Sequence, residues 1–94
     1  MRIRIDQPSL DIIRRLPPDL KRDVRRAIDA LGIDPYDPGG GGAKKLRTSE
    51  EAPAVYRIRV REWRVAYRIE PGLVEVVKVF HRSEGYAWME RMGY

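Results

Sequence analysis

The second half of the sequence concentrates side chains that can bind and cleave a phosphodiester group. Arginine supplies a fixed positive charge, histidine exchanges protons near neutral pH, and tyrosine stacks on a base or acts as acid or base. The candidates for these roles are Arg57, Arg59, Arg64, His81, Arg82 and Tyr86. A lone histidine or tyrosine is usually structural, so the combination is what indicates chemistry on a phosphate.

The net charge of the 94-residue chain is +5, and most of the excess lies between residues 44 and 64, where seven basic and three acidic residues give +4. Such a concentration favours a polyanionic partner, either nucleic acid or an acidic protein segment. If the partner is RNA, the candidates for further contacts are Lys44, Lys45, Arg47, Arg61 and Arg68. A solvated charged face would give the same count, so charge alone leaves both readings open.

Composition excludes several classes of protein. The chain has no cysteine, which rules out disulfides and cysteine-based metal sites, and its single histidine rules out a multi-histidine zinc site. No apolar run approaches the roughly 20 residues of a membrane span, and the alternating residues Met1–Ile5 are unlike a signal peptide. We therefore expect one cytoplasmic domain over residues 1–94, with no metal, no cofactor and no membrane partner.

The first third of the chain predicts a strand followed by a helical hairpin. Alternating arginine and isoleucine predict a strand at Arg2–Asp6, and Ser9 is the expected N-cap of a helix that runs to Leu16. Pro17 and Pro18 end that helix and begin a second one, with apolar residues at helical spacing up to Leu31. Gly32 is its expected C-cap. The residues Asp34–Gly42 read as a connecting loop. Its four glycines lack the Gly-Lys-Ser/Thr ending of a phosphate-binding loop.

After this loop the apolar period changes to two, which predicts strands at Ala54–Val60, Trp63–Ile69 and Leu73–His81. The short connections predict an antiparallel meander, and Pro71 with Gly72 fits a tight turn. A short helix is expected over Ser83–Met92. The predicted fold class is α+β: an N-terminal strand, an αα-hairpin, a meander completing a four-stranded sheet, and a short C-terminal helix. The helices are expected on one face of the sheet.

Side-chain alternation predicts which residues share a face. Apolar residues of the first two meander strands must meet the helices, so the arginines at positions 57, 59, 61, 64 and 68 are expected on the opposite, open face. Like charges on neighbouring strands repel each other, which indicates an anion bound against them. The alternative is that Glu62, Glu70 and Glu75 neutralise these arginines locally.

This pattern resembles the RelE/ParE superfamily of bacterial and archaeal type II toxins. The residues that carry the resemblance are Leu16-Pro17-Pro18, Ala43-Lys44-Lys45-Leu46, Val55-Tyr56-Arg57-Ile58-Arg59-Val60, Trp63-Arg64-Val65-Ala66-Tyr67-Arg68-Ile69 and Val79-Phe80-His81-Arg82 with Tyr86. They cover nearly the whole chain in the family's order. The chain departs from the family by having arginine at positions 57 and 59, where some members have lysine, and in its four-glycine loop.

The resemblance implies a ribosome-dependent endonuclease that cuts mRNA in the A site and is silenced by a cognate antitoxin through an acidic or helical segment. It implies catalytic roles for Arg57, Arg59, Arg64, Arg82 or His81, and Tyr86. In such a reaction the RNA 2′-OH attacks the neighbouring phosphate without a metal, the arginines stabilise the phosphorane, and His81 or Tyr86 transfers protons. Two alternatives are a ParE-like toxin that inhibits DNA gyrase and a non-toxic RNA-binding member. Trp88, Met89 and Met92 suit either a partner groove or the core.

Overall fold

The computed structural model describes residues 1–37, 43–46 and 54–94. The elements are β1 (Arg2–Ile5), α1 (Gln7–Arg15), α2 (Pro18–Ile33), β2 (Lys44–Leu46), β3 (Val55–Val60), β4 (Trp63–Glu70), β5 (Leu73–His81), a 3₁₀ turn (Arg82–Glu84) and α3 (Ala87–Arg91). The strands form one mixed sheet in the order β1-β5-β4-β3-β2. β3, β4 and β5 form the predicted antiparallel meander, and β1 joins its edge parallel to β5.

The α+β class is confirmed, but the described sheet has five strands and the prediction of four is wrong. The additional strand, β2, pairs antiparallel with β3. It has only three residues, too few to show a two-residue period against the glycine-rich stretch before it. Its existence matters for the site because it places two lysines beside β3.

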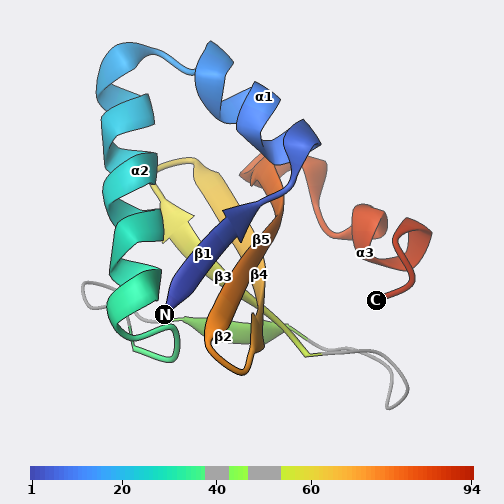
Figure 1. Ribbon diagram of the computed structural model, residues 1–94. Coiled ribbons are helices and arrows are strands. Elements are labelled where there is room, and N and C mark those ends of the chain that lie inside the picture. The colour runs from blue at the N-terminus through green and yellow to red at the C-terminus, as the bar shows by residue number, and fades with distance from the viewer. Residues whose placement is uncertain (38–42, 47–53) are drawn as a thin grey trace.

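Both faces of the sheet carry an apolar cluster, so the prediction that all helices cover one face is wrong. Figure 1 shows α1 and α2 on one side of the sheet and α3 on the other. The cluster beneath α1 and α2 consists of Ile13, Leu16, Val24, Ile28, Leu31, Ile58, Val60, Val65, Tyr67, Val74, Val76 and Val79. The cluster beneath α3 consists of Leu46, Val55, Ala66, Val77, Phe80, Trp88 and Met89. The face opposite the hairpin is therefore open only in part.

The first helix begins earlier than predicted. Its N-cap is Asp6, whose side chain accepts a hydrogen bond from the Ser9 backbone N–H at 2.9 Å, so Ser9 lies inside the helix. Pro8 does not break this first turn, because the first backbone N–H groups of a helix have no intrahelical partner to lose. The break between the two helices falls at Pro17, as predicted.

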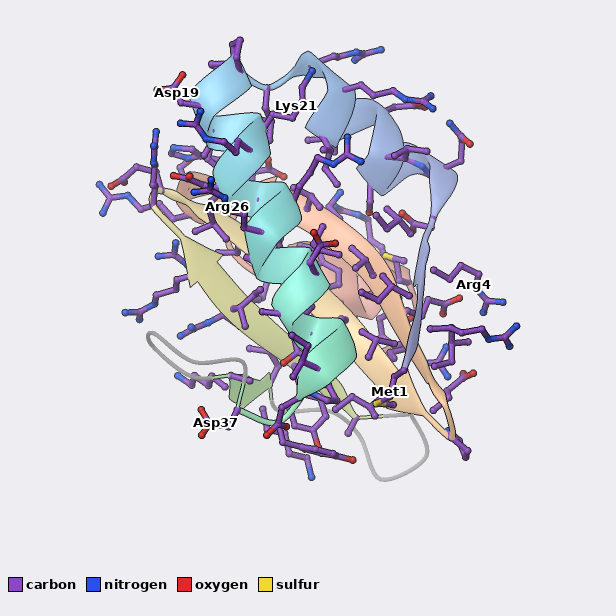
Figure 2. The ribbon with its side chains drawn as sticks, turned by 60° about the vertical axis from the view of Figure 1, so that its left-hand side comes forward. Met1, Arg4, Asp19, Lys21, Arg26 and Asp37 are labelled. Atoms are coloured by element: carbon purple, nitrogen blue, oxygen red, sulfur yellow. The ribbon has the colours of Figure 1, made fainter. Side chains whose placement is uncertain are left out.

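Gly32 is not a C-cap; α2 continues to Ile33 and is capped by Asp34. A Cβ atom at position 32 would lie 3.1 Å from the Ile3 side chain and 3.3 Å from the Met1 carbonyl oxygen. The N-terminal ammonium group donates to the Gly32 carbonyl at 2.8 Å. A Cβ atom here would press on β1, so the glycine favours the close approach of β1 to α2. Figure 2 shows α2 lying across the sheet next to β1.

The C-terminal segment is also divided differently from the prediction of one helix over Ser83–Met92. It forms the 3₁₀ turn and then α3, separated at Gly85, which has a φ of 66°. A left-handed residue interrupts a right-handed helix. Trp88 and Met89 are buried in the α3 cluster, whereas Met92 is 44% exposed, so the first two side chains belong to the core.

Tyr67 connects the sheet to the segment that follows α2. Its side chain is fully buried, and its hydroxyl donates to the Pro35 carbonyl at 2.6 Å. We expect Tyr67→Phe to lower the free energy of unfolding by about 1 kcal/mol, because the buried Pro35 carbonyl loses its partner. Urea unfolding of both proteins measures this loss. Tyr36→Phe, at a position that is 63% exposed, is the matched control and should leave the midpoint unchanged.

Because the phenol of Tyr67 is buried, we expect the free energy of unfolding to change at alkaline pH. Burial, followed by the proximity of Tyr56 and Asp34, raises the pKa of Tyr67. In the unfolded chain a tyrosine ionises near pH ~10, so above that pH the unfolded state releases a proton that the folded state keeps. Stability is therefore retained below pH ~10 and falls above it. Tyr67→Phe should show a flatter profile there, and identical alkaline slopes would contradict this account.

Candidate functional site

Three of the predicted arginines gather on the α3 side of the sheet. Arg59 lies directly opposite Arg64 across β3 and β4, and Arg57 shares the face of Arg59 because it lies two residues away on the same strand. We refer to Arg57, Arg59 and Arg64 as the arginine cluster. The arginine cluster lies between the apolar cluster beneath α3 and the end of the β3–β4 hairpin. Arg57 is only 7% exposed, whereas Arg59 is exposed.

The positive charges of the arginine cluster repel one another. Partial burial, and then the positive charges of Arg59 and Arg57, lower the pKa of Arg64 from its ordinary value. Arg64 is fixed by its own turn, because its Nη1 donates to the carbonyls of Arg61 at 3.0 Å and Trp63 at 2.8 Å. Within the described residues no carboxylate forms an ion pair with any of the three. This concentration of unneutralised charge favours a bound anion.

Tyr86 lies beside this cluster, as the sequence predicted. Its hydroxyl oxygen accepts a hydrogen bond from Arg57 Nε at 3.3 Å, and its ring packs edge-on against Phe80, with centroids 5.5 Å apart. Phe80 pairs with Arg64 across β4 and β5, so the phenol and the guanidinium groups share one face. The side chain of Tyr86 is 42% exposed. Its oxygen accepts from Arg57, and a phenol that accepts one hydrogen bond can still donate its own O–H to a ligand.

His81 lies on the other face of the sheet, so the structure does not bring this candidate catalytic residue to the arginine cluster. It pairs with Trp63, and the two rings meet edge-on with centroids 5.6 Å apart on the side of α1 and α2. Its Nδ1 accepts from the Ser83 backbone N–H at 3.2 Å, while Glu84 accepts from the His81 N–H, which makes the imidazole a cap of the 3₁₀ turn.

Arg82 lies at the end of the hairpin and is bound to a carboxylate. Its Nε lies 2.5 Å from Glu62 Oε2, and its backbone N–H donates to the Glu62 carbonyl at 2.8 Å. The side chain of Arg82 is 64% exposed. In the sequence, Glu62 was a candidate only for neutralising the arginines. Its place in a two-residue turn between two arginine-bearing strands brings it to the same end of the sheet as Arg59 and Arg64.

The other predicted RNA-binding residues are divided among several places. Lys44 pairs with Arg57 and shares its face, whereas Lys45 pairs with Tyr56 and lies on the opposite one. Arg47 lies outside the described residues. Of the two lysines predicted to contact RNA, Lys44 therefore lies beside the arginine cluster and Lys45 does not.

Arg61 and Arg68 do not join the arginine cluster. Arg61 lies in the β3–β4 turn with a φ of 56°, leaves the strand's alternation, and forms ion pairs with Asp23 at 2.7 Å and Asp19 at 3.9 Å on α2. Its predicted placement is wrong. Arg68 keeps the predicted face but is bound by Glu70 at 2.9 Å and Glu75 at 3.3 Å. The alternative of local neutralisation by glutamate therefore holds for Arg68.

The described residues hold neither a group of acidic, histidine or cysteine side chains that could bind a metal ion nor a helix long and apolar enough to cross a membrane. The chemistry of the site rests on guanidinium groups, a phenol and a carboxylate. Such a set can bind a phosphodiester and stabilise negative charge that develops on it.

The chain thus combines a mixed sheet, a helical hairpin on one face, and an arginine cluster beside a short helix on the other. The family model described as the ParE toxin of type II toxin–antitoxin system, parDE, matches residues 6–86. The chain belongs to this family, and it is a toxin of the RelE/ParE superfamily. A comparison with curated protein sequences returns no significant match.

Solved structures share the fold at low sequence identity. A chain of the archaeal RelE–RelB complex from Pyrococcus horikoshii OT3 is 21% identical with a TM-score of 0.74, covering 89% of this chain and 97% of that one. A chain of the RelBE2 toxin–antitoxin complex from Mycobacterium tuberculosis is 24% identical with a TM-score of 0.67, covering 86% and 96%. The isolated E. coli RelE toxin is 17% identical with a TM-score of 0.68, covering 97% and 94%.

Proposed function

We propose that this toxin is an endoribonuclease that cuts mRNA in the ribosomal A site without a metal ion. The observation that carries the proposal is the arginine cluster, which lies on one face beside the hydroxyl of Tyr86 and forms no ion pair with a carboxylate of the described residues. An RNA strand supplies its own nucleophile, the 2′-OH, so the protein has to position the phosphate, stabilise charge and move protons. Arginine forks suit the first two tasks because they bind phosphate oxygens through paired donors.

In this proposal the cluster binds the scissile phosphate and stabilises the phosphorane. Arg64, held by two backbone carbonyls, presents donors that are oriented before substrate arrives, and Arg57 is fixed by burial and by Tyr86. Preorganised donors of this kind supply a large share of catalysis. The Tyr86 O–H protonates the departing 5′-oxygen, and Arg59 and Lys44 bind the flanking backbone. His81 has no part in the reaction.

The experiment is to add the purified protein to ribosomes translating a defined mRNA and to map new 5′ ends by primer extension. We expect cuts within the A-site codon that leave a 5′-hydroxyl and a 2′,3′-cyclic phosphate. An mRNA carrying a 2′-deoxy sugar at the cut position should remain intact, because it lacks the nucleophile. Cleavage of the deoxy substrate, or no cleavage of either, would overturn the proposal.

Inhibition of DNA gyrase is the second candidate, and the family model favours it because it describes the ParE toxin. A gyrase inhibitor would use the same basic face to bind protein or DNA without any chemistry on RNA. Trapped gyrase–DNA adducts, in the absence of cut A-site mRNA, would support this candidate. A protein that binds RNA but neither cuts it nor stops growth would instead be a non-toxic member.

We also propose a cognate antitoxin as partner, acting in the cytoplasm where the ribosome is found. The structural relatives include the intact RelBE complex of E. coli and the YoeB–YefM heterotetramer of Staphylococcus aureus. An acidic segment of such a partner would be attracted to the positive charge of the arginine cluster. A small acidic protein with a DNA-binding N-terminus, encoded beside this chain, would support this proposal.

A further inference from the structure

The proposed reaction needs a proton acceptor for the 2′-OH, and the arginine cluster contains none. Arginine stays protonated at every pH relevant to proteins. His81 lies on the other face of the sheet, where it caps the 3₁₀ turn. The oxygen of Tyr86 already accepts a hydrogen bond from Arg57, which leaves its O–H as a donor. A different group must therefore accept the proton.

Glu62 is the carboxylate that the fold brings to the cluster. It lies in the two-residue turn of the β3–β4 hairpin. The pair Val60–Trp63 closes this turn, and Arg59–Arg64 is the next pair along the two strands. Its charge acts on the guanidinium group of Arg64. Its Oε2 lies 2.5 Å from Arg82 Nε, and its side chain is 56% exposed. One carboxylate oxygen is thus held by Arg82, which leaves the other for a ligand.

Other carboxylates near the sheet are committed elsewhere in the described chain. Glu70 and Glu75 bind Arg68 four residues further along β4, roughly 13 Å from Arg64 at the rise of a strand. Asp19 and Asp23 bind Arg61 on the α2 side. Glu84 accepts from the His81 backbone. Among the carboxylates of residues 1–37, 43–46 and 54–94, Glu62 is the one whose charge acts on Arg64.

We propose that Glu62 is a catalytic residue that takes the proton from the attacking 2′-OH, an inference that rests on the proposed function. In the step, the 2′-oxygen forms a bond to phosphorus as its proton moves to Glu62, and the bond from phosphorus to the 5′-oxygen breaks. The departing oxygen receives the Tyr86 proton. The products are a 2′,3′-cyclic phosphate and a 5′-hydroxyl, and exchange with water restores both side chains. Arg82 positions Glu62.

The test compares Glu62→Gln with the unchanged protein in single-turnover cleavage on programmed ribosomes. General base catalysis contributes roughly 10²–10⁴-fold, so we expect a loss of that size in the cleavage rate. Binding to the ribosome should be unchanged or tighter, because a negative charge is removed. Glu62→Asp should keep part of the rate. The matched control is Glu84→Gln, another exposed glutamate two residues from Arg82, which should cleave as the unchanged protein does.

Two outcomes overturn the assignment while leaving the proposed function intact. One is that Glu62→Gln cuts as fast as the unchanged protein or faster, which would make Glu62 only a counter-charge. The other is that Glu62→Gln loses its full factor of cleavage rate even when Arg82→Ala is already present, which would mean that Arg82 does not position Glu62. If the unchanged protein does not cut mRNA at all, both the proposed function and this assignment are overturned. Thermal unfolding of each variant shows whether the fold is retained.

Discussion

Replacing Arg64 by alanine is expected to slow mRNA cleavage on the ribosome by roughly 10²–10³-fold, the usual loss when one preorganised donor to a developing anion is removed. Arg64 lies opposite Arg59, and two backbone carbonyls fix its Nη1. The variant loses both the charge and its orientation. Single-turnover cleavage of a defined mRNA on purified ribosomes measures the rate, and thermal unfolding shows whether the fold is retained.

Two further variants show whether position or charge causes the loss at Arg64. Arg64→Lys keeps the charge but loses the planar fork, so it should recover only part of the rate. Arg26→Ala removes one positive charge from an exposed position on α2, across the sheet from the cluster, and should cleave normally (Figure 2). If alanine at both Arg64 and Arg82 leaves cleavage unchanged, the site assignment is wrong.

Replacing Phe80 by alanine is expected to lower the free energy of unfolding by about 3–5 kcal/mol. Phe80 is 1% exposed in the cluster beneath α3, where its ring packs against Trp88 with centroids 5.3 Å apart and against Tyr86. Truncation leaves a cavity between β5 and α3. Urea unfolding measures the loss, and Phe80→Leu, which keeps more of the volume, should cost less.

Met92→Ala provides the control for the Phe80 variant. Met92 is a large apolar residue at the end of α3 but 44% exposed, so its loss should change stability by no more than about 0.5 kcal/mol. Equal losses for Met92→Ala and Phe80→Ala would show that the α3 cluster does not stabilise the fold. Cleavage by Phe80→Leu is a second readout, because Phe80 supports the ring of Tyr86.

Much of the fold could be predicted because its signals are local. The strand boundaries of β3 to β5 follow the two-residue period, and the turn at Pro71 and Gly72 is confirmed by a φ of 70° at the glycine. The break at Pro17 follows from the backbone restriction that proline imposes. β2 and the N-cap at Asp6 were missed because a three-residue strand has no period and Pro8 resembles a helix breaker.

The place of His81 depended on a feature that the amino-acid pattern does not show. The pairing of β4 with β5 shifts between Ala66 and Tyr67, where Val77 is left without a partner. Val76 faces the helical hairpin, Val77 faces α3, and Val79 faces the hairpin again. A bulged residue exchanges the faces of every residue after it. Simple alternation from Val76 would have put His81 on the face of the arginine cluster.

The sequence by itself determined that Arg57, Arg59 and Arg64 share a face, because strict alternation along two adjacent strands is a local property of the chain. Only the tertiary structure decided which groups accompany them. In the folded chain Arg68 pairs with two glutamates and Arg61 pairs with α2. His81 lies on the opposite face of the sheet, and Glu62 lies beside Arg82. These outcomes depend on a bulge, a turn with positive φ and contacts between distant segments, and none of them has a periodic signature.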